Sequence, residues 1–270
     1  MRRQRAKKKT IQQIQGERTV QNAILTTGQA LIPLIASDEN ICPIKSGGSL
    51  FIEYHTSEEC KRLLVAPSTI SDNDCGTSPV TLTDWMFALT RENMKQMYDA
   101  CPGWGWDEQG KYTELAHKEA RFLVLFDPSS DPPLLHAGAT TRQDTDLKRR
   151  PVAFAHIRYE MERCKPILYL YEVQVSKLYQ GQSLGSCMVQ RIETLGKHFN
   201  LDRIMLTVFV NNVGARNFYK RLGYTIDTSS PNQEHVNDRD LQDIADTGAG
   251  YIILSKGLKD ESSMLVKKRS

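Results

Sequence analysis

Three small residues before a predicted helix form the most distinctive short motif of the chain. The stretch L-Y-Q-G-Q-S-L-G-S-C-M, residues 178–188, places Gly181, Ser183 and Gly185 between a predicted strand and that helix. A glycine-containing turn at such a point presents backbone N–H groups at the positive end of the helix dipole, where an anion binds. The motif therefore predicts a phosphate or pyrophosphate site, and the alternative is an ordinary turn before a helix.

Two well-known phosphate loops do not fit this stretch. The Walker loop requires a lysine after its last glycine, and the dinucleotide fingerprint requires three spaced glycines and an acidic residue about 20 positions later. Ser183 stands where a glycine is expected; we expect it to be tolerated with a negative φ and a side chain that points away from the phosphate. The stretch also contains no Lys or Arg, which favours a modest affinity for the anion.

Acidic and aromatic residues mark a second candidate site. Glu160 and Glu162 are two residues apart in a predicted strand, so both carboxylates lie on one face and can bind a guanidinium group. Solvent-facing carboxylates on a hairpin are the alternative interpretation. Tyr169 and Tyr171 share a face of the next strand unless a bulge intervenes. Trp104 follows a Pro-Gly break, so we expect it on a loop, where aromatic side chains commonly line a pocket.

The elements that must position these residues follow from hydrophobic periodicity. Residues 81–98 have apolar residues at helical spacing, and Thr83 or Asp84 is expected to cap this helix. A hairpin insertion is predicted at 127–150. Strands are predicted at 121–126, 151–160, 167–175, 203–209, 224–228 and 250–256, and further helices near 107–120, at 184–199 and from residue 212. This order predicts an α/β fold with a mixed sheet and packed helices.

Composition is that of an ordinary soluble globular protein. The chain has 270 residues, 40% hydrophobic and 25% charged. It has no apolar run long enough for a membrane helix, and its basic first residues lack the apolar segment of a signal peptide. We therefore expect an intracellular protein without a membrane partner. The six cysteines form no C-x-x-C pair, which favours reduced thiols and no metal.

Positive charge is concentrated at both ends. Residues 1–18 contain seven Lys or Arg against one Glu, and residues 256–270 contain five against two, which leaves the middle of the chain net negative. An acidic body suits a basic substrate, and basic ends suit RNA, a ribosome or a nuclear address, or are simply solvated. We expect four parts: a basic helical arm (1–35), an irregular N-terminal extension (36–80), a catalytic domain (81–256) and a basic C-terminal tail (257–270).

Two motifs in register resemble the GCN5-related N-acetyltransferases. Gln180-x-x-Ser183-x-Gly185 is similar to their Q/R-x-x-G-x-G/A loop, which binds the pyrophosphate of acetyl-CoA, with a mismatch at Ser183. Residues 211–224, N-N-V-G-A-R-N-F-Y-K-R-L-G-Y, match their N-x-x-A-x-x-F-Y-x-x-x-G-F/Y element at the expected distance. The resemblance implies the GCN5-related acetyltransferase fold, with a mixed, mostly antiparallel sheet and flanking helices. It also implies acetyl-CoA as cosubstrate and no metal.

Longer sequence segments resemble one branch of this superfamily, the N-alpha-acetyltransferase D family of histone N-terminal acetyltransferases. They are Y-L-Y-E-V-Q at 169–174, M-L-T-V-F at 205–209, I-D-T-S-S-P at 226–231 and M-Y…W-G-W within 97–106. This resemblance implies acetylation of the N-terminal serine of histone H4 and of the H2 type A histone, which begin Ser-Gly-Arg-Gly. It further implies a location in cytoplasm and nucleus, with a ribosome as a second partner for the basic arm.

The same resemblance assigns roles to individual positions. Glu172 matches the general base, and Tyr219 is the secondary candidate for protonating the departing thiolate. Positions that match acetyl-CoA contacts are Val173, Gln174, Val175, Gln180, Gly181, Gln182, Ser183, Leu184, Gly185, Ser186 and Asn212. Positions that match peptide contacts are Tyr98, Trp104, Glu160, Glu162, Tyr169, Tyr171, Thr207, Ser229 and Tyr251. Glu160 stands where a shorter aspartate is expected, and with Glu162 it is expected to receive the arginine at the substrate's third position.

The implied reaction is direct transfer of acetyl to an α-amino group. About a quarter of such groups are neutral near pH 7.4, because their pKa is near 7.7 to 8.0, so a mild base such as Glu172 suffices. The backbone N–H of Val173 is the expected donor to the thioester oxygen. The alternatives are an acetyl-CoA-dependent lysine or small-amine acetyltransferase, an acetyl-CoA- or ribosome-binding module that Ser183 has weakened, and a nucleic-acid-binding protein that uses its basic ends.

Overall fold

The computed structural model describes residues 9–35, 41–43, 49–65, 80–101, 103–127, 150–231 and 250–259. The strands are β1 Ile41–Pro43, β2 Ser49–Thr56, β3 Leu64–Val65, β4 Val80–Thr81, β5 Arg121–Asp127, β6 Arg150–Glu162, β7 Lys165–Val175, β8 Arg203–Phe209, β9 Thr225–Ile226 and β10 Tyr251–Gly257. The helices are α1 Ile11–Leu25, α2 Gly28–Ile35, α3 Ser57–Cys60, α4 Leu82–Asp99, α5 Glu108–Leu115, α7 Leu184–His198 and α8 Val213–Arg221, with a 3₁₀ turn at Lys177–Tyr179. The first eight residues, nearly all of the insertion predicted at 127–150 and most of the C-terminal tail lie outside the described ranges.

Eight strands form one sheet in the order β1-β2-β5-β6-β7-β8-β10-β9, while β3 and β4 pair separately. Within the large sheet every neighbouring pair is antiparallel except β7 and β8. The hairpin between β6 and β7 turns at Arg163 and Cys164, whose φ angles of 45° and 64° are typical of a two-residue type I′ turn. The predicted α/β fold with a mixed, mostly antiparallel sheet is confirmed.

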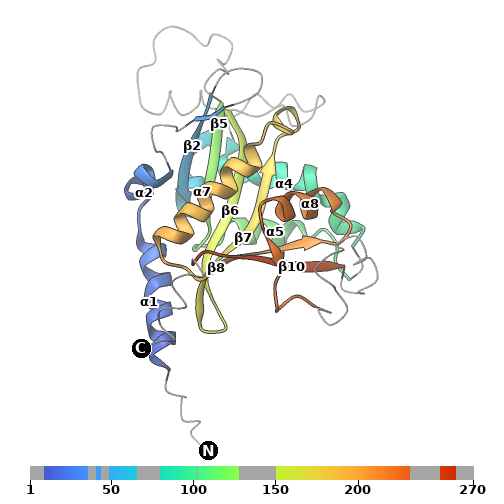
Figure 1. Cartoon of the computed structure of the whole chain (residues 1–270). Coiled ribbons are helices and arrows are strands. Elements are labelled where there is room, and N and C mark those ends of the chain that lie inside the picture. The colour runs from blue at the N-terminus through green and yellow to red at the C-terminus, as the bar shows by residue number, and fades with distance from the viewer. Residues whose placement is uncertain are drawn as a thin grey trace, which may run out of the picture.

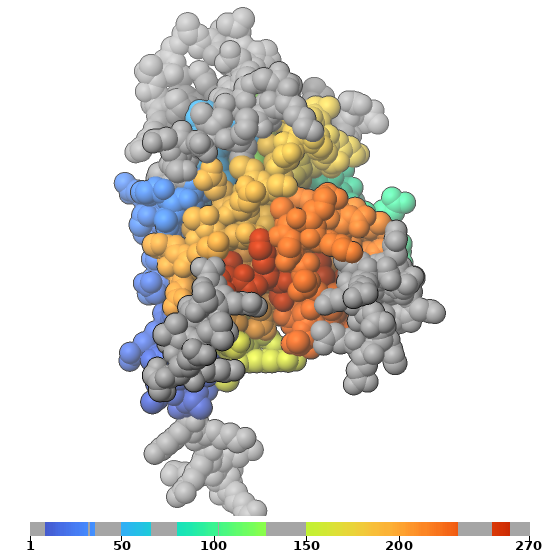
Figure 2. All heavy atoms as spheres, in the orientation of Figure 1, coloured from blue at the N-terminus to red at the C-terminus, as the bar shows by residue number. Residues whose placement is uncertain are grey.

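Helices cover both faces of the sheet, because β5 is apolar on both sides. Phe122 and Phe154 pack with Trp85 of α4, whereas Leu123 belongs to the second core, which α1, α2 and α7 cover together with residues such as Ile192. Figure 1 shows α7 across the front of the sheet and α4 and α5 behind it. In Figure 2 the atoms of α7 and α8 cover the near face, and a small area of β10, in red, shows between them.

The N-terminal part contributes more regular structure than predicted. Segment 36–80 was expected to be irregular, but β2 lies within it and pairs with β5. Leu50, Ile52 and Tyr54 are buried at alternate positions, so this short strand extends the sheet and one of the two cores. The predicted helical arm is confirmed for α1, which is tied to the sheet by Arg121: its Nη2 donates to the carbonyl of Ile24 at 2.8 Å. The expectation of an irregular extension is therefore wrong for β2.

Helix α4, Leu82–Asp99, agrees with the predicted 81–98 to within one residue, but its N-cap differs from the prediction. Thr81, and neither Thr83 nor Asp84, is its N-cap; the Thr81 hydroxyl accepts from the Asp84 backbone N–H at 3.1 Å. Trp85 and Leu89 lie on its buried face, as the helical spacing predicted. The helix predicted near 107–120 is shorter and ends at Leu115.

Cysteine chemistry differs from the prediction at one position. Cys60, Cys101 and Cys164 are free, but Cys187 is disulfide-bonded, so the expectation of reduced thiols is wrong there. Spacing along the chain does not report which cysteines the fold brings together. Among the described helices none has the length and apolar character to cross a membrane.

Candidate active site

The two parallel strands β7 and β8 separate halfway along their length. Their pairing ends where Leu170 lies opposite Leu206, although β7 continues to Val175 and β8 to Phe209. The second halves of these strands therefore line a gap in the middle of the sheet. Loops and helices that follow the strands meet at this opening, so it is the natural place for a ligand.

A β-bulge lies at the start of the gap. On β6, His156 pairs with Glu172 and Ile157 pairs with Leu170, which leaves Tyr171 as the extra residue of β7. A bulge of this kind changes the direction of the side chains that follow it. The predicted alternation of Tyr169 and Tyr171 is thus interrupted, and their rings lie 5.0 Å apart.

A pocket of about 270 Å³ occupies the gap and contains most of the predicted catalytic and peptide positions. Its lining includes Tyr98, Trp104, Tyr169, Tyr171, Glu172, Val173, Gln174, Thr207, Asn212 and Tyr219. Six further lining residues were not predicted: Met94, Lys111, Glu114, Val208, Phe209 and Ala215. Lys111 and Glu114 belong to α5, for which no sequence motif indicated a role.

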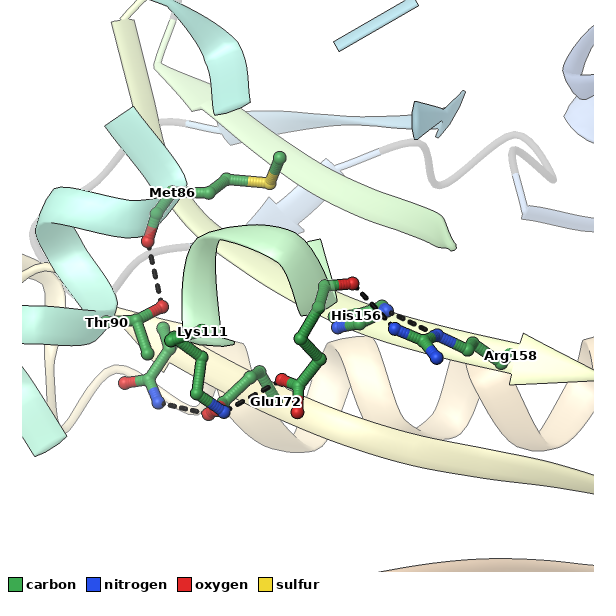
Figure 3. A network of polar contacts seen from close by, with 8 residues as sticks. Met86, Thr90, Lys111, His156, Arg158 and Glu172 are labelled. Atoms are coloured by element: carbon green, nitrogen blue, oxygen red, sulfur yellow. Dashed lines mark hydrogen bonds and ion pairs between the residues drawn. The ribbon is translucent and has the colours of Figure 1, made fainter. Parts of the chain in front are cut away.

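The predicted base, Glu172, is buried, and each of its two carboxylate oxygens has a polar partner. Lys111 Nζ lies 2.9 Å from Glu172 Oε1 and 2.8 Å from Glu114 Oε1 (Figure 3). The amide of Gln174 donates to Glu172 Oε2 at 2.7 Å, and Asn93 donates to Gln174 at 3.0 Å. The side chain of Gln174 therefore orients the carboxylate rather than facing a cosubstrate.

Lys111 and Tyr219, which line this pocket, have displaced pKa values. Burial by itself would lower the pKa of Lys111, but the neighbouring Glu172 and Glu114 carboxylates outweigh burial and raise it, so the ammonium stays charged. Burial raises the pKa of Tyr219, and Glu172 adds to the effect. The Tyr219 phenol therefore keeps its proton near neutral pH and is a weaker acid than an ordinary phenol.

The predicted acidic slot lies beside the two tyrosines. The Tyr171 hydroxyl donates to Glu160 at 2.8 Å, and Tyr169 is hydrogen-bonded to Thr207 at 2.6 Å. Burial raises the pKa of Tyr169, and the negative charges of Glu160 and Glu162 raise it further, so both carboxylates act on the same tyrosine. Glu160 is thus held by the pocket, whereas Glu162 forms a longer ion pair of 3.6 Å with the exposed Arg163.

Aromatic rings form the opposite wall. The centroid of Phe209 lies 4.8 Å from Tyr98 and 5.3 Å from Trp104, and Tyr251 lies 5.5 Å from Trp104, all edge to face. Trp104 remains 46% exposed, so its ring is available to a ligand. Of the predicted peptide contacts, Glu160, Glu162, Ser229 and Tyr251 lie outside the lining of this pocket, and the Ser229 hydroxyl donates to Asp227 at 2.7 Å.

A second pocket, of about 300 Å³, lies at the glycine-containing loop. Its lining contains the predicted positions Val175, Gln180, Gly181, Ser183, Leu184, Gly185 and Ser186, and also Tyr179, Phe218 and Arg221. Gln182 lies outside this lining, and its amide donates to the Leu178 carbonyl at 3.3 Å. Arg221, the last residue of α8, places a cation in this second pocket, whereas the loop itself contains none.

The backbone of Ser183 contradicts the prediction of a negative φ. Its φ of 66° and ψ of 10° are left-handed, a conformation that costs an L-residue about 1–2 kcal/mol. Gly185 lies directly below Phe218, whose ring a Cβ at this position would meet at 3.3 Å. Asn212, predicted to contact acetyl-CoA, lines the first pocket and caps α8 by accepting from Ala215 N at 3.0 Å. The loop therefore has the shape of an anion cradle, with a serine in a glycine conformation.

Split parallel strands with an anion loop between β7 and α7 define a class of acyl-transferring enzymes. Residues 91–224 match the family model described as Acetyltransferase (GNAT) family. The chain therefore has the GNAT fold and belongs to the GNAT acetyltransferases. Among the described residues no group of three His, Cys, Asp or Glu is placed to hold a metal ion.

The chain is similar to several solved structures at low sequence identity. PaiA N-acetyltransferase from Thermoplasma acidophilum in complex with coenzyme A is 12% identical, with 78% of this chain and 99% of that chain covered and a TM-score of 0.44. NAA60 of Arabidopsis thaliana in complex with a bisubstrate analogue is 8% identical, with 77% and 99% covered and a TM-score of 0.45.

Replacement of Ser183 by glycine tests the strain in the loop. Ser183→Gly is expected to stabilise the fold by up to about 1 kcal/mol, since relief of the left-handed strain exceeds the added entropy of the unfolded chain. Gly181→Ala, at a φ of 72°, is the matched change in the opposite direction and should destabilise it. Thermal unfolding measures both. A rise in acetyl-CoA affinity of more than about tenfold in Ser183→Gly would mean that the serine also obstructs the phosphates.

Removal of Arg221 tests the cation of the second pocket. Arg221→Ala is expected to weaken acetyl-CoA binding about tenfold, because a charge-assisted hydrogen bond to a phosphate is lost. Calorimetry with acetyl-CoA and with acetyl-pantetheine, which lacks the pyrophosphate, measures the effect. Lys220→Ala removes a neighbouring exposed cation outside the lining and serves as control. Equal loss for both ligands would show that Arg221 acts on the fold instead.

Proposed function

We propose that this protein is an N-terminal α-amino acetyltransferase that acetylates the serine of histone H4 and of the H2 type A histone. The observation that carries the proposal is the position of Glu172. Its carboxylate lines the gap between β7 and β8, next to Tyr169 and Tyr171, with the carboxylate of Glu160 bound to Tyr171. This arrangement offers a base for an amine and a negative charge for a cation farther along the peptide.

Three residues of the pocket have separate roles in the proposed acetyl transfer. Bound acetyl-CoA supplies the acetyl thioester. As the substrate nitrogen bonds to the thioester carbon, Glu172 accepts the amine proton, directly or through one water. The backbone N–H of Val173 stabilises the negative charge on the thioester oxygen. The carbon–sulfur bond then breaks and the thiolate takes a proton from Tyr219, which lines the same pocket as Glu172.

The acidic slot gives the proposal its sequence preference. A substrate that begins Ser-Gly-Arg has an arginine at its third position, and Glu160 and Glu162 supply negative charge for that arginine. A bidentate guanidinium–carboxylate pair is the strongest hydrogen-bonded contact available to such a residue. For the basic N-terminal arm, residues 1–35, we propose a contact with the ribosome during synthesis, and for the enzyme a place in both cytoplasm and nucleus.

Mass spectrometry of a Ser-Gly-Arg-Gly-Lys peptide tests the proposed function. The peptide is incubated with enzyme and acetyl-CoA, beside the same peptide with a blocked N-terminus. Acetyl on the free α-amine alone is the expected result. Acetyl on lysine in both peptides identifies a lysine acetyltransferase, and binding of acetyl-CoA without any transfer identifies a binding module.

A further inference from the structure

Lys111 is a buried cation at the centre of the proposed active site. Its side chain is 8% exposed, and its ammonium group contacts Glu172 and Glu114 at once. The same group lies over the ring of Tyr98, 5.1 Å from the centroid. A contribution to stability does not by itself account for such a cluster, because apolar replacements of buried ion pairs are commonly neutral or stabilising.

The contacts of Lys111 complete a clamp around Glu172. Lys111 holds Oε1 from α5, and Gln174, which Asn93 of α4 orients, holds Oε2 at 2.7 Å. Both oxygens of the carboxylate are thus fixed by separate elements. Each oxygen has one lone-pair direction left for a further partner in the pocket.

We propose that Lys111 is a positioning residue for acetyl transfer: it keeps the Glu172 carboxylate aimed into the gap, and Glu114 anchors Lys111. The inference rests on the proposed role of Glu172 as base. In the transfer step the proton goes from the substrate nitrogen to Glu172, and Lys111 neither gains nor loses one.

Five other titratable groups of the described residues lie near this cluster: three tyrosines, a histidine and an arginine. They are Tyr98 from α4, His156 and Arg158 from β6, Tyr171 from β7 and Tyr219 from α8. Burial raises the pKa of Tyr98 to about 12, and Glu172 adds to this effect. Burial lowers the pKa of His156 well below its ordinary value. The Arg158 guanidinium donates to the Glu114 carbonyl at 2.6 Å and lies over Tyr171, so Lys111 is the cation that contacts the base.

Steady-state kinetics of the full chain with acetyl-CoA and the Ser-Gly-Arg-Gly-Lys peptide, between pH 6 and 9, test the inference. Lys111→Met is expected to lower kcat/KM about 100-fold at pH 7. Lys111→Arg retains the charge and the contact with Glu172, and should restore most of this loss. Lys118→Met, at an exposed lysine after α5, is the matched control.

A double variant separates a positioning role from a structural one. If Lys111 acts through Glu172, adding Lys111→Met to Glu172→Gln has little further effect on kcat/KM. An effect that persists in the double variant, or a Lys111→Arg enzyme as impaired as Lys111→Met, overturns the inference. Thermal unfolding and acetyl-CoA binding report the fold of each variant, and Lys111→Gln, which keeps a polar contact, replaces Lys111→Met if the latter does not fold.

Failure of the proposed function has a different signature. A wild-type protein without transfer to the peptide amine overturns the proposed function and this inference together. Full activity of Glu172→Gln overturns the role of Glu172 as base, and with it the role of Lys111. Loss of activity in Glu172→Gln beside an unaffected Lys111→Met overturns only the inference about Lys111.

Discussion

Glu172→Gln is expected to lower kcat for acetyl transfer by about 10²–10⁴-fold, the usual contribution of a general base. Glutamine has nearly the shape of glutamate, so it fills the same space between Lys111 and Gln174, but its amide does not accept the amine proton. The affinity for acetyl-CoA should change little, because the loop pocket lies apart from this carboxylate.

Single-turnover kinetics with saturating acetyl-CoA measure the effect most directly, because they isolate the transfer step from product release. Glu119→Gln, at a carboxylate outside the pocket lining, is the matched control. The variant also leaves Lys111 with Glu114 as its remaining carboxylate, so its thermal unfolding has to be measured alongside. A folded Glu172→Gln enzyme with kcat within about tenfold of wild type would exclude this residue as the base.

Charge reversal of the acidic slot is the second large effect. Glu160→Lys with Glu162→Lys is expected to lower kcat/KM for the Ser-Gly-Arg-Gly-Lys peptide by about 100-fold or more, because like charges then face each other across the slot. Of the two single variants, Glu160→Lys should have the larger effect. Glu160 is bound to Tyr171 beside the pocket, whereas Glu162 interacts with the exposed Arg163.

A charge-swapped peptide gives this prediction its control. A Ser-Gly-Glu-Gly-Lys peptide should be a poor substrate of the wild type and a better one of the doubly reversed variant. Binding of acetyl-CoA, measured by calorimetry, should be the same in all four proteins. Unchanged turnover of the arginine peptide by the double variant would show that these carboxylates only face solvent.

Local patterns were sufficient to predict most elements of the domain. The strands around residues 151–175, the helix after the loop and strand β8 all follow from periodicities of two and 3.6 residues, which depend only on neighbours along the chain. Strand β2 was missed, because one short alternating segment among polar residues is stabilised mainly by its pairing with β5. Such patterns do not predict which strand a segment pairs with when the partner lies far away in sequence.

By itself, the sequence determined the order of strands and helices from residue 81 onward, the loop between β7 and α7, and the places of Glu172, Tyr169 and Tyr171 along β7, because these features lie within contiguous segments. Only the tertiary structure decided what surrounds them. It brought Lys111 to Glu172 across 61 positions and Arg221 to the loop, and it set Ser183 in a left-handed conformation. Ion pairs and backbone angles of this kind depend on how separate elements pack, and sequence spacing carries no information about those distances.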